Sequence, residues 1–215
     1  MLRSQFGIPT ATIWRACDEI SVILSRMSHI NIRFPDSQEF ENLMNGMRSL
    51  DTLYGAILAI DGCHIKINRP KTNFMSYYNK YQYFSICLVV ASDYRKMIRS
   101  VSYQCGSWHD AGVYRNSEMR IIIDQIGRHG AFVIGDPAFG GFDNIRTTNS
   151  TISRQITTTE SQALGRQRVL VENCFALLKE RFKILSYKIS NKSVRKNLRI
   201  IKSCIFLHNF IIENE

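Results

Sequence analysis

The sequence lacks the motifs that identify several common classes of protein. Its six cysteines are scattered, with no C-x-x-C pair, which argues against a zinc or disulfide framework and fits a reducing compartment. No apolar run approaches the roughly 18 residues of a membrane helix, and the first ten residues lack the apolar core of a signal peptide. No G-x-G-x-x-G, phosphate-binding-loop or G-x-S-x-G string supports a nucleotide enzyme or a serine hydrolase. We expect a soluble intracellular protein with no membrane span.

The positive charge of the chain is concentrated near its C-terminus. Residues 1–60 hold five Lys or Arg against six Asp or Glu, whereas residues 61–215 hold 23 against 12. Residues 165–202 alone carry 11 basic and two acidic residues. So local an excess favours a partner that bears phosphates, and the alternative is a solvated basic face.

The first 50 residues predict a small helical segment. Thr10 can cap a helix whose apolar residues fall on one side: Ile13, Ala16, Cys17, Ile20, Leu24 and Met27. A short turn that leads into such a helix is typical of the second half of a helix-turn-helix, but Arg15 is the one cation in its first half. We interpret residues 1–50 as a remnant of such a unit or as a packing helix, with a second short helix over residues 36–50.

Beyond residue 50 the pattern changes to strands that alternate with helices. A buried strand is expected to end at Asp61-Gly62, a hairpin to follow over residues 81–104, and a helix to begin near Asp110. Another strand, residues 130–136, ends at Asp136. Helices are then expected over residues 166–185 and 192–213. This order predicts an α/β fold with a mixed sheet flanked by helices.

The helix predicted over residues 166–185 combines a buried face with one glutamate at its border. Its apolar residues recur at steps of three and four and must face a core: Val171, Cys174, Phe175, Leu178, Phe182 and Leu185. Glu172 lies one residue off this stripe, among cations that include Arg168. A carboxylate in this position suggests a metal ligand beside a polyanion, and the alternative is a first-turn glutamate paired with Arg168.

Three acids from separate elements form a candidate metal site. Asp61 and Asp136 both follow apolar strands next to a glycine, and the ends of strands line the ligand crevice of open α/β sheets. Together with Glu172 they offer hard oxygen ligands of the kind that Mg²⁺ or Mn²⁺ prefers. Two such ions about 4 Å apart can promote attack on a phosphodiester. The pattern predicts a nuclease or strand transferase.

Five strings in series resemble the DDE transposases of the PIF/Harbinger group and the nuclease-like proteins derived from them. They are IDGCHI at 60–65, GSWHDAGVYRNS at 106–117, GDPAFGGF at 135–142, VENCFALLKERFKIL at 171–185 and SCIFLHNFII at 203–212. The resemblance implies a ribonuclease H-like domain, here placed at residues 51–215, and metal-dependent attack on DNA. It implies that Asp61, Asp136 and Glu172 are the catalytic acids, and that Asp110 is a fourth residue of the metal site.

This sequence departs from the pattern of that group next to two of the acids. Cys63 stands where the group usually has a hydroxyl residue, and Pro137 to Gly141 replaces a loop of Ser-Gly-Tyr-Pro type. Among the histidines, we expect His64 to be hydrogen-bonded and to face away from Asp61. His109 either orients a water or caps a turn, and His208 is expected at the edge of a core.

These observations lead to two hypotheses of different classes. The first is a Mg²⁺- or Mn²⁺-dependent DNA endonuclease derived from a transposase, whose phosphate-binding cations are Arg168, Lys179, Arg181, Lys183, Lys192, Arg195 and Lys196. The second is a DNA-binding or protein-interaction module that no longer cuts. In both, the resemblance implies DNA as a partner, a Myb-like DNA-binding protein as a second partner, and the nucleus as the location. Self-association and a cytoplasmic fraction stay open.

Overall fold

The computed structural model describes residues 7–49, 54–148 and 158–215, without the side chains of several residues between 158 and 168. Its α-helices and strands are α2 (Thr10–Asn31), α3 (Phe40–Arg48), β1 (Ala56–Lys66), β2 (Ser85–Ser92), β3 (Ile98–Cys105), α4 (Asp110–Arg115), α5 (Glu118–Ile126), β4 (Phe132–Gly135), β5 (Ile145–Arg146), α6 (Thr158–Arg181), α7 (Lys183–Ser186) and α8 (Val194–Asn214). Short 3₁₀ turns lie at Phe74–Tyr77 (η1), Gly127–His129 (η2) and Pro137–Phe139 (η3). No helix in the described residues is long and apolar enough to span a membrane.

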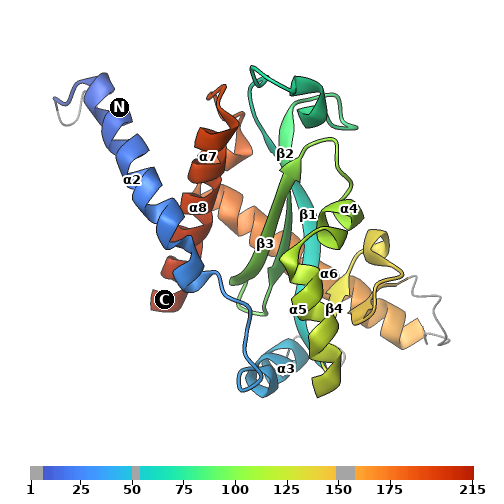
Figure 1. Ribbon diagram of the computed structural model, residues 1–215. Coiled ribbons are helices and arrows are strands. Elements are labelled where there is room, and N and C mark those ends of the chain that lie inside the picture. The colour runs from blue at the N-terminus through green and yellow to red at the C-terminus, as the bar shows by residue number, and fades with distance from the viewer. Residues whose placement is uncertain (1–6, 50–53, 149–157) are drawn as a thin grey trace.

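The sheet has five strands in the order β3-β2-β1-β4-β5, with β1 at its centre. Strands β1, β2 and β3 form an antiparallel meander, whereas β4 pairs in parallel with β1 and β5 with β4. A mixed sheet of this order, with helices on both faces, is a ribonuclease H-like α/β fold, which confirms the predicted fold class (Figure 1).

The central strand β1 is longer than its sequence pattern indicates. The apolar run was expected to end at Asp61-Gly62, but β1 continues to Lys66 because residues 59–66 pair throughout with β2. It is β4 that ends here: Gly135 is the register partner of Ile60. Asp61 follows Ile60 in β1, and Asp136 follows Gly135 at the end of β4. The strand end that was expected to expose the site is therefore the end of β4 and not the end of β1.

Each face of the sheet packs on its own layer of helices. One core contains Ile60, Cys87 and Val89 and is closed by α3, α4 and α5. The other contains Ala59, Cys63 and Leu88 and is closed by α6 and α8. The apolar stripe predicted for the helix that contains Glu172 lies in this second core, which confirms that interpretation, although α6 begins at Thr158, earlier than expected.

The hairpin between β2 and β3 is held by buried polar groups. Asp93 is 1% exposed; its Oδ1 accepts hydrogen bonds from the backbone N–H groups of Arg95 and Met97, and its Oδ2 pairs with Arg99 at 2.9 Å. On β3, the backbone N–H of Ile98 donates to Oδ1 of buried Asn209 on α8. These bonds fix the hairpin predicted at residues 81–104 against the last helix.

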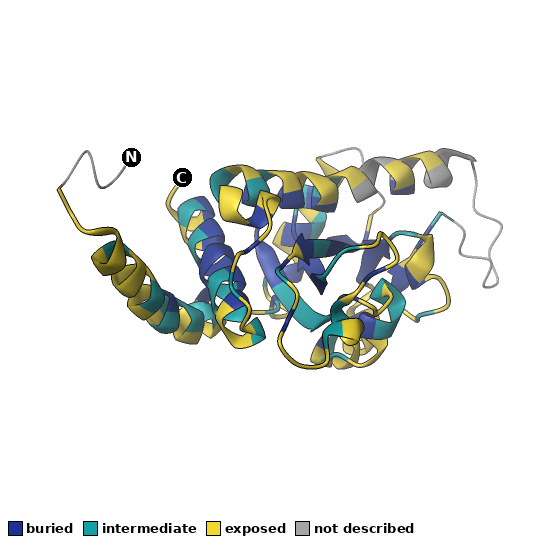
Figure 2. Cartoon of the chain, turned by 90° about the horizontal axis from the view of Figure 1, so that it is seen from above, coloured by how far each residue is buried: buried dark blue, intermediate teal, exposed yellow. Residues whose placement is uncertain are grey.

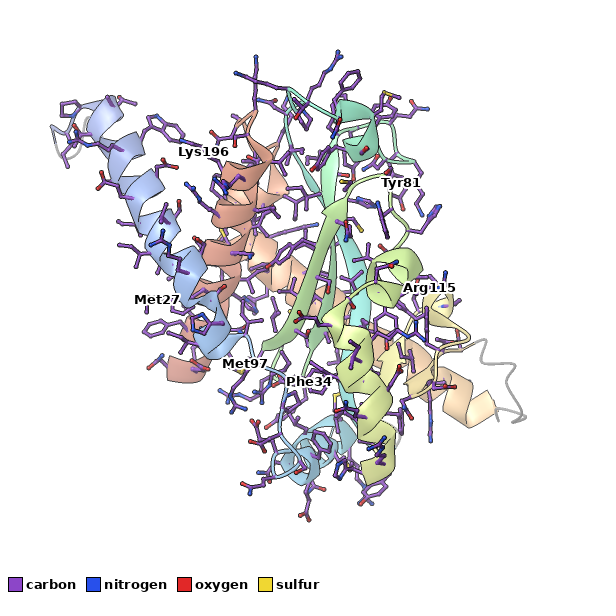
Figure 3. The ribbon with its side chains drawn as sticks, in the orientation of Figure 1. Met27, Phe34, Tyr81, Met97, Arg115 and Lys196 are labelled. Atoms are coloured by element: carbon purple, nitrogen blue, oxygen red, sulfur yellow. The ribbon has the colours of Figure 1, made fainter. Side chains whose placement is uncertain are left out.

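Helix α2 lies beside α8 (Figure 1) and is bound to it through polar groups, while much of the helix is exposed (Figure 2). Ser203 Oγ of α8 donates to the backbone carbonyl of Ser21, and Lys196 pairs with Asp18 at 3.1 Å. Of the apolar residues singled out in the sequence, Ile13 and Leu24 are half-buried, whereas the others are exposed: Ala16, Cys17, Ile20 and Met27 (labelled in Figure 3). Trp14, Ile23 and Ile30 are exposed as well. Most of the predicted apolar side is therefore exposed within the described residues, and the interpretation of residues 1–50 as a helix-turn-helix remnant or a packing helix stays a prediction. The N-cap position is Pro9, without a side-chain cap, so Thr10 does not cap the helix as expected.

Candidate active site

Asp61 lies at the centre of β1, on the face that packs against α6. Its Oδ1 accepts a hydrogen bond from the backbone N–H of Gly62 at 2.7 Å. Burial, and then the negative charges of Asp136, Asp110 and Glu172, raise the pKa of Asp61 to about 6. The fold therefore brings the four acids singled out in the sequence close enough for their charges to act on one carboxyl group.

Asp136 directly follows β4 and begins the 3₁₀ turn Pro137–Phe139. Its Oδ1 accepts from the backbone N–H of Ala138 at 2.9 Å, while the second carboxylate oxygen remains for other partners. Phe139 is fully buried and contacts the ring of Tyr114 on α4 edge to face. The unusual Pro137 to Gly141 segment thus anchors the backbone beside Asp136 without using both of its oxygens.

Glu172 lies on the exposed border of α6, as its position in the sequence predicted. Val171 and Cys174, on either side of it, are fully buried and fix the helix against the sheet. The proposed pairing of Glu172 with Arg168 lies outside the described side chains. A glutamate anchored in this way reaches over the edge of the core toward Asp61, whose pKa its charge raises.

Asp110 approaches from the opposite face of the sheet. It is the first residue of α4 and lies over Gly62, where an added Cβ would stand 2.1 Å from the Asp110 Cγ. Because side chains alternate along a strand, Gly62 and Asp61 face opposite sides, so Asp110 and Asp61 flank β1. A glycine at position 62 is therefore required for Asp110 to come this close.

On the same face as Asp110, His64 and Cys87 complete a group that the sequence did not reveal. The Cys87 thiol donates to Asp110 Oδ1 at 3.3 Å, and the His64 Nδ1 lies 3.0 Å from Ser85 Oγ. His64 is thus hydrogen-bonded and faces away from Asp61, as predicted. Burial and the nearby Asp110 carboxylate raise the pKa of the Cys87 thiol, and burial lowers the pKa of His64. Only the pairing of β1 with β2 places residues 64 and 87 side by side.

A pocket of about 70 Å³ opens beside these groups. Its lining comprises His64, Lys80, Gly106, Ser107, Trp108, His109, Asp110 and Ala138. The pocket therefore connects the His64 side of the sheet with the turn that follows Asp136. Tyr81, which lies above α4 in Figure 3, packs its ring edge to face on His64 nearby. The volume suits an ion with a few waters, and is too small to enclose a nucleotide.

The donor chemistry of the four acids fits a hard divalent cation. Carboxylate oxygens are the ligands that Mg²⁺ and Mn²⁺ prefer, and a cation would offset the burial and the neighbouring negative charges that raise the pKa of Asp61. Among the described residues, the group of three whose ligand atoms all lie within 4.8 Å of one another is a different one, His64, Cys87 and Asp110. In the part of the chain that the structure describes, no three of the four acids form such a group.

The cations expected to bind DNA have different environments. Lys179 lies beside the buried thiol of Cys63: burial raises the pKa of this thiol, and the Lys179 ammonium limits the rise. Lys179 therefore lies on the Asp61 side of β1, where Cys63 is found. Arg181 pairs with Glu215 and donates to the backbone carbonyl of His208. His208 is fully buried and hydrogen-bonded to the Lys96 carbonyl, as expected of a core residue.

The remaining cations lie at the surface. Lys183, Lys192 and Arg195 are exposed, and Lys196 is engaged with Asp18 of α2. The side chain of Arg168 lies outside the described part of the structure. Of the cations predicted to bind DNA, four are in positions available to phosphates: Lys179, Lys183, Lys192 and Arg195.

Comparison with known proteins identifies the family to which the chain is similar. A family model described as DDE superfamily endonuclease matches residues 60–209. The chain is 24% identical over 212 residues to the human protein named "Putative nuclease HARBI1", an alignment that covers 97% of this chain and 61% of that protein. The rat and bovine proteins of the same name match with the same identity and coverage. The chain thus spans about three fifths of the length of these relatives. No solved structure matches it.

Proposed function

Because the chain belongs to the family of DDE superfamily endonucleases, we propose that it is a Mg²⁺- or Mn²⁺-dependent nuclease that hydrolyses phosphodiester bonds of DNA. The observation that carries this proposal is the convergence of charge on Asp61. Three further acids, from β4, α4 and α6, act on a carboxyl group whose own burial already disfavours ionisation. This arrangement of acids makes the metal-free protein less stable, and the binding of divalent cations would explain why the acids lie together.

In the proposed reaction, Asp61, Asp136 and Glu172 hold the divalent cations, and Asp110 contributes from the other side of β1. The cations, when bound, supply Lewis acidity toward the phosphodiester. The protein holds these ligands rigidly, because β1 is buried in the centre of the sheet and α6 is fixed through Val171 and Cys174. This rigidity keeps the carboxylates in place while the substrate backbone moves.

The basic residues bind the DNA backbone in this proposal. Lys179, which lies next to the Asp61 side of β1, contacts phosphates close to the scissile bond. Lys183, Lys192 and Arg195, exposed on α7, α8 and the segment between them, contact phosphates farther away. Such contacts hold DNA without reading its sequence, so binding should weaken steeply as salt concentration rises.

The proposal is tested by cleavage of supercoiled plasmid DNA with Mg²⁺ or Mn²⁺. We expect Asp136→Asn to reduce cleavage by at least 100-fold, since it removes the charge of a proposed ligand but keeps the oxygen that accepts from Ala138. Asp143→Asn is the matched control, because Asp143 is an exposed acid seven residues further on that does not act on Asp61. Cleavage that survives in Asp136→Asn protein would rule out the assignment.

The same experiment separates a nuclease from a module that only binds DNA. Calorimetric titration with Mn²⁺ should show binding to the unaltered protein and weaker binding to the Asp136→Asn variant. If the folded protein binds DNA but neither binds Mn²⁺ nor cleaves the plasmid, it is a DNA-binding module without nuclease activity. For a protein that acts on DNA we propose the nucleus as location and a Myb-like protein as a candidate partner.

A further inference from the structure

Three potential metal ligands of mixed chemistry meet on the α4 face of the sheet. His64 of β1 and Cys87 of β2 are direct partners in the antiparallel register, and Asp110 enters from the first turn of α4. One ligand atom of each lies within 4.8 Å of the other two. Three ligands from three separate elements are fixed by the fold and not by a local sequence motif.

The distances are close to those of a tetrahedral zinc site. Zinc bonds of about 2.0 Å to nitrogen or oxygen and about 2.3 Å to sulfur place neighbouring ligand atoms roughly 3.3–3.8 Å apart. The Cys87 Sγ and Asp110 Oδ1 lie 3.3 Å apart, which is within this range. Because the three ligand atoms all lie within 4.8 Å of one another, a small adjustment of the side chains is sufficient for them to close around an ion.

Hydrogen bonds around His64 orient it as a ligand. Its Nδ1 contacts Ser85 Oγ at 3.0 Å, and the buried Asn79 Nδ2 donates to the same Ser85 Oγ at 2.9 Å. Ser85 is fully buried, so this chain of bonds holds the imidazole ring in place. With Nδ1 engaged, Nε2 is the nitrogen that remains for a metal. A ligating histidine whose second nitrogen is held in this way is the usual arrangement in metal proteins.

The neighbouring pocket provides room for a fourth ligand. His64 and Asp110 form part of the lining of the 70 Å³ pocket, whereas Cys87 is fully buried beneath it. A metal held by the three side chains would therefore have its open position toward solvent, where a water can complete the tetrahedron. Lys80, Trp108 and His109 lie around this opening.

We propose that His64, Cys87 and Asp110 form a zinc site, chemically distinct from the all-carboxylate site although Asp110 belongs to both. A thiolate and an imidazole favour Zn²⁺ over Mg²⁺, which prefers oxygen ligands. On binding, the Cys87 thiol releases its proton to solvent and the sulfur donates an electron pair to the ion, with no change in oxidation state. The site does not depend on nuclease activity, because binding of Zn²⁺ by these three side chains requires neither DNA nor its cleavage.

The test is titration of the full chain, kept reduced and free of metal, with Co²⁺ as a spectroscopic substitute for Zn²⁺. We expect tetrahedral visible bands and a thiolate-to-cobalt charge-transfer band in the near ultraviolet whose intensity corresponds to one Co²⁺ per chain, and loss of these bands when Zn²⁺ is added. Cys87→Ser should abolish the charge-transfer band. Cys63→Ser is the matched control: Cys63 is a buried thiol of β1 in the other core, so the band should persist.

A second variant keeps the proposal testable if Cys87→Ser protein does not fold. His64→Ala leaves the thiol in place and should weaken Co²⁺ binding by at least tenfold, with circular dichroism used to confirm the fold. Co²⁺ that binds without a charge-transfer band, a band that persists in folded Cys87→Ser protein, or unchanged affinity in His64→Ala protein would each overturn the proposal. These readouts do not involve DNA cleavage, so failure of the nuclease assay leaves the result intact.

Discussion

Replacement of Asp61 by Asn should stabilise the metal-free protein at neutral pH. In the folded state the pKa of this carboxyl is raised from 3.8 to about 6, first by burial and then by Asp136, Asp110 and Glu172. The ionised form at pH 7.5 is therefore a cost to folding. Asn removes the charge, keeps the shape, and retains an oxygen that accepts from the Gly62 N–H. The metal-free protein is thus expected to be more stable without the charge of Asp61, although Asp61 lies at the centre of the proposed metal site.

The size of the stability difference and its pH range follow from the shift in the pKa of Asp61. A rise of roughly two pKa units corresponds to about 3 kcal/mol, an upper limit because Asn is not an ideal replacement. Since the folded state holds the proton more tightly, the stability of the unaltered protein falls as pH rises from about 4 to about 6 and is level above. The advantage of Asp61→Asn should be full at pH 7.5 and largely absent at pH 4.

Urea denaturation with a chelator present, at pH 7.5 and at pH 4.5, measures this difference. Glu180→Gln, which removes an exposed charge from the same helix as Glu172, is the control and should change stability by less than about 0.5 kcal/mol. Added Mn²⁺ should reverse the order at pH 7.5, because it stabilises the unaltered protein by mass action and the variant much less. Equal stabilities of variant and unaltered protein at pH 7.5 without metal would refute the reasoning.

Three further predictions concern single contacts. Gly62→Ala would set a Cβ 2.1 Å from the Asp110 Cγ, so it should displace Asp110 and reduce plasmid cleavage by at least tenfold. Asn209→Ala removes bonds to both backbone groups of Ile98 and should destabilise the fold by about 2–4 kcal/mol in urea denaturation. The exposed pair Ile23→Gln and Ile30→Gln should change the free energy of unfolding by less than about 0.5 kcal/mol each, and a large loss would contradict the exposed orientation of α2.

The sequence alone determined the elements whose pattern is local. The apolar stripe around Glu172 faces the core as its three- and four-residue spacing required, and the hairpin turn lies at Asp93 to Lys96 where the strand pattern breaks. Asp61, Asp136 and Glu172 were found from their positions after apolar strands and at the border of a helix, and Asp110 from the resemblance to the PIF/Harbinger group. The charges that act on Asp61 come from the same acids. For α6 periodicity is sufficient because one side of the helix is buried against the sheet.

Tertiary structure decided what depends on neighbours far away in the chain. Periodicity identified an apolar side on α2, but not that α8 would bind the polar side through Ser203 and Lys196. The length of β1 beyond Asp61 depends on its pairing with β2. The same pairing sets Cys87 beside His64, although scattered cysteines had argued against a zinc framework on local spacing alone. Strand register and helix docking are set by contacts between distant residues, and such contacts leave no periodic trace in a single sequence.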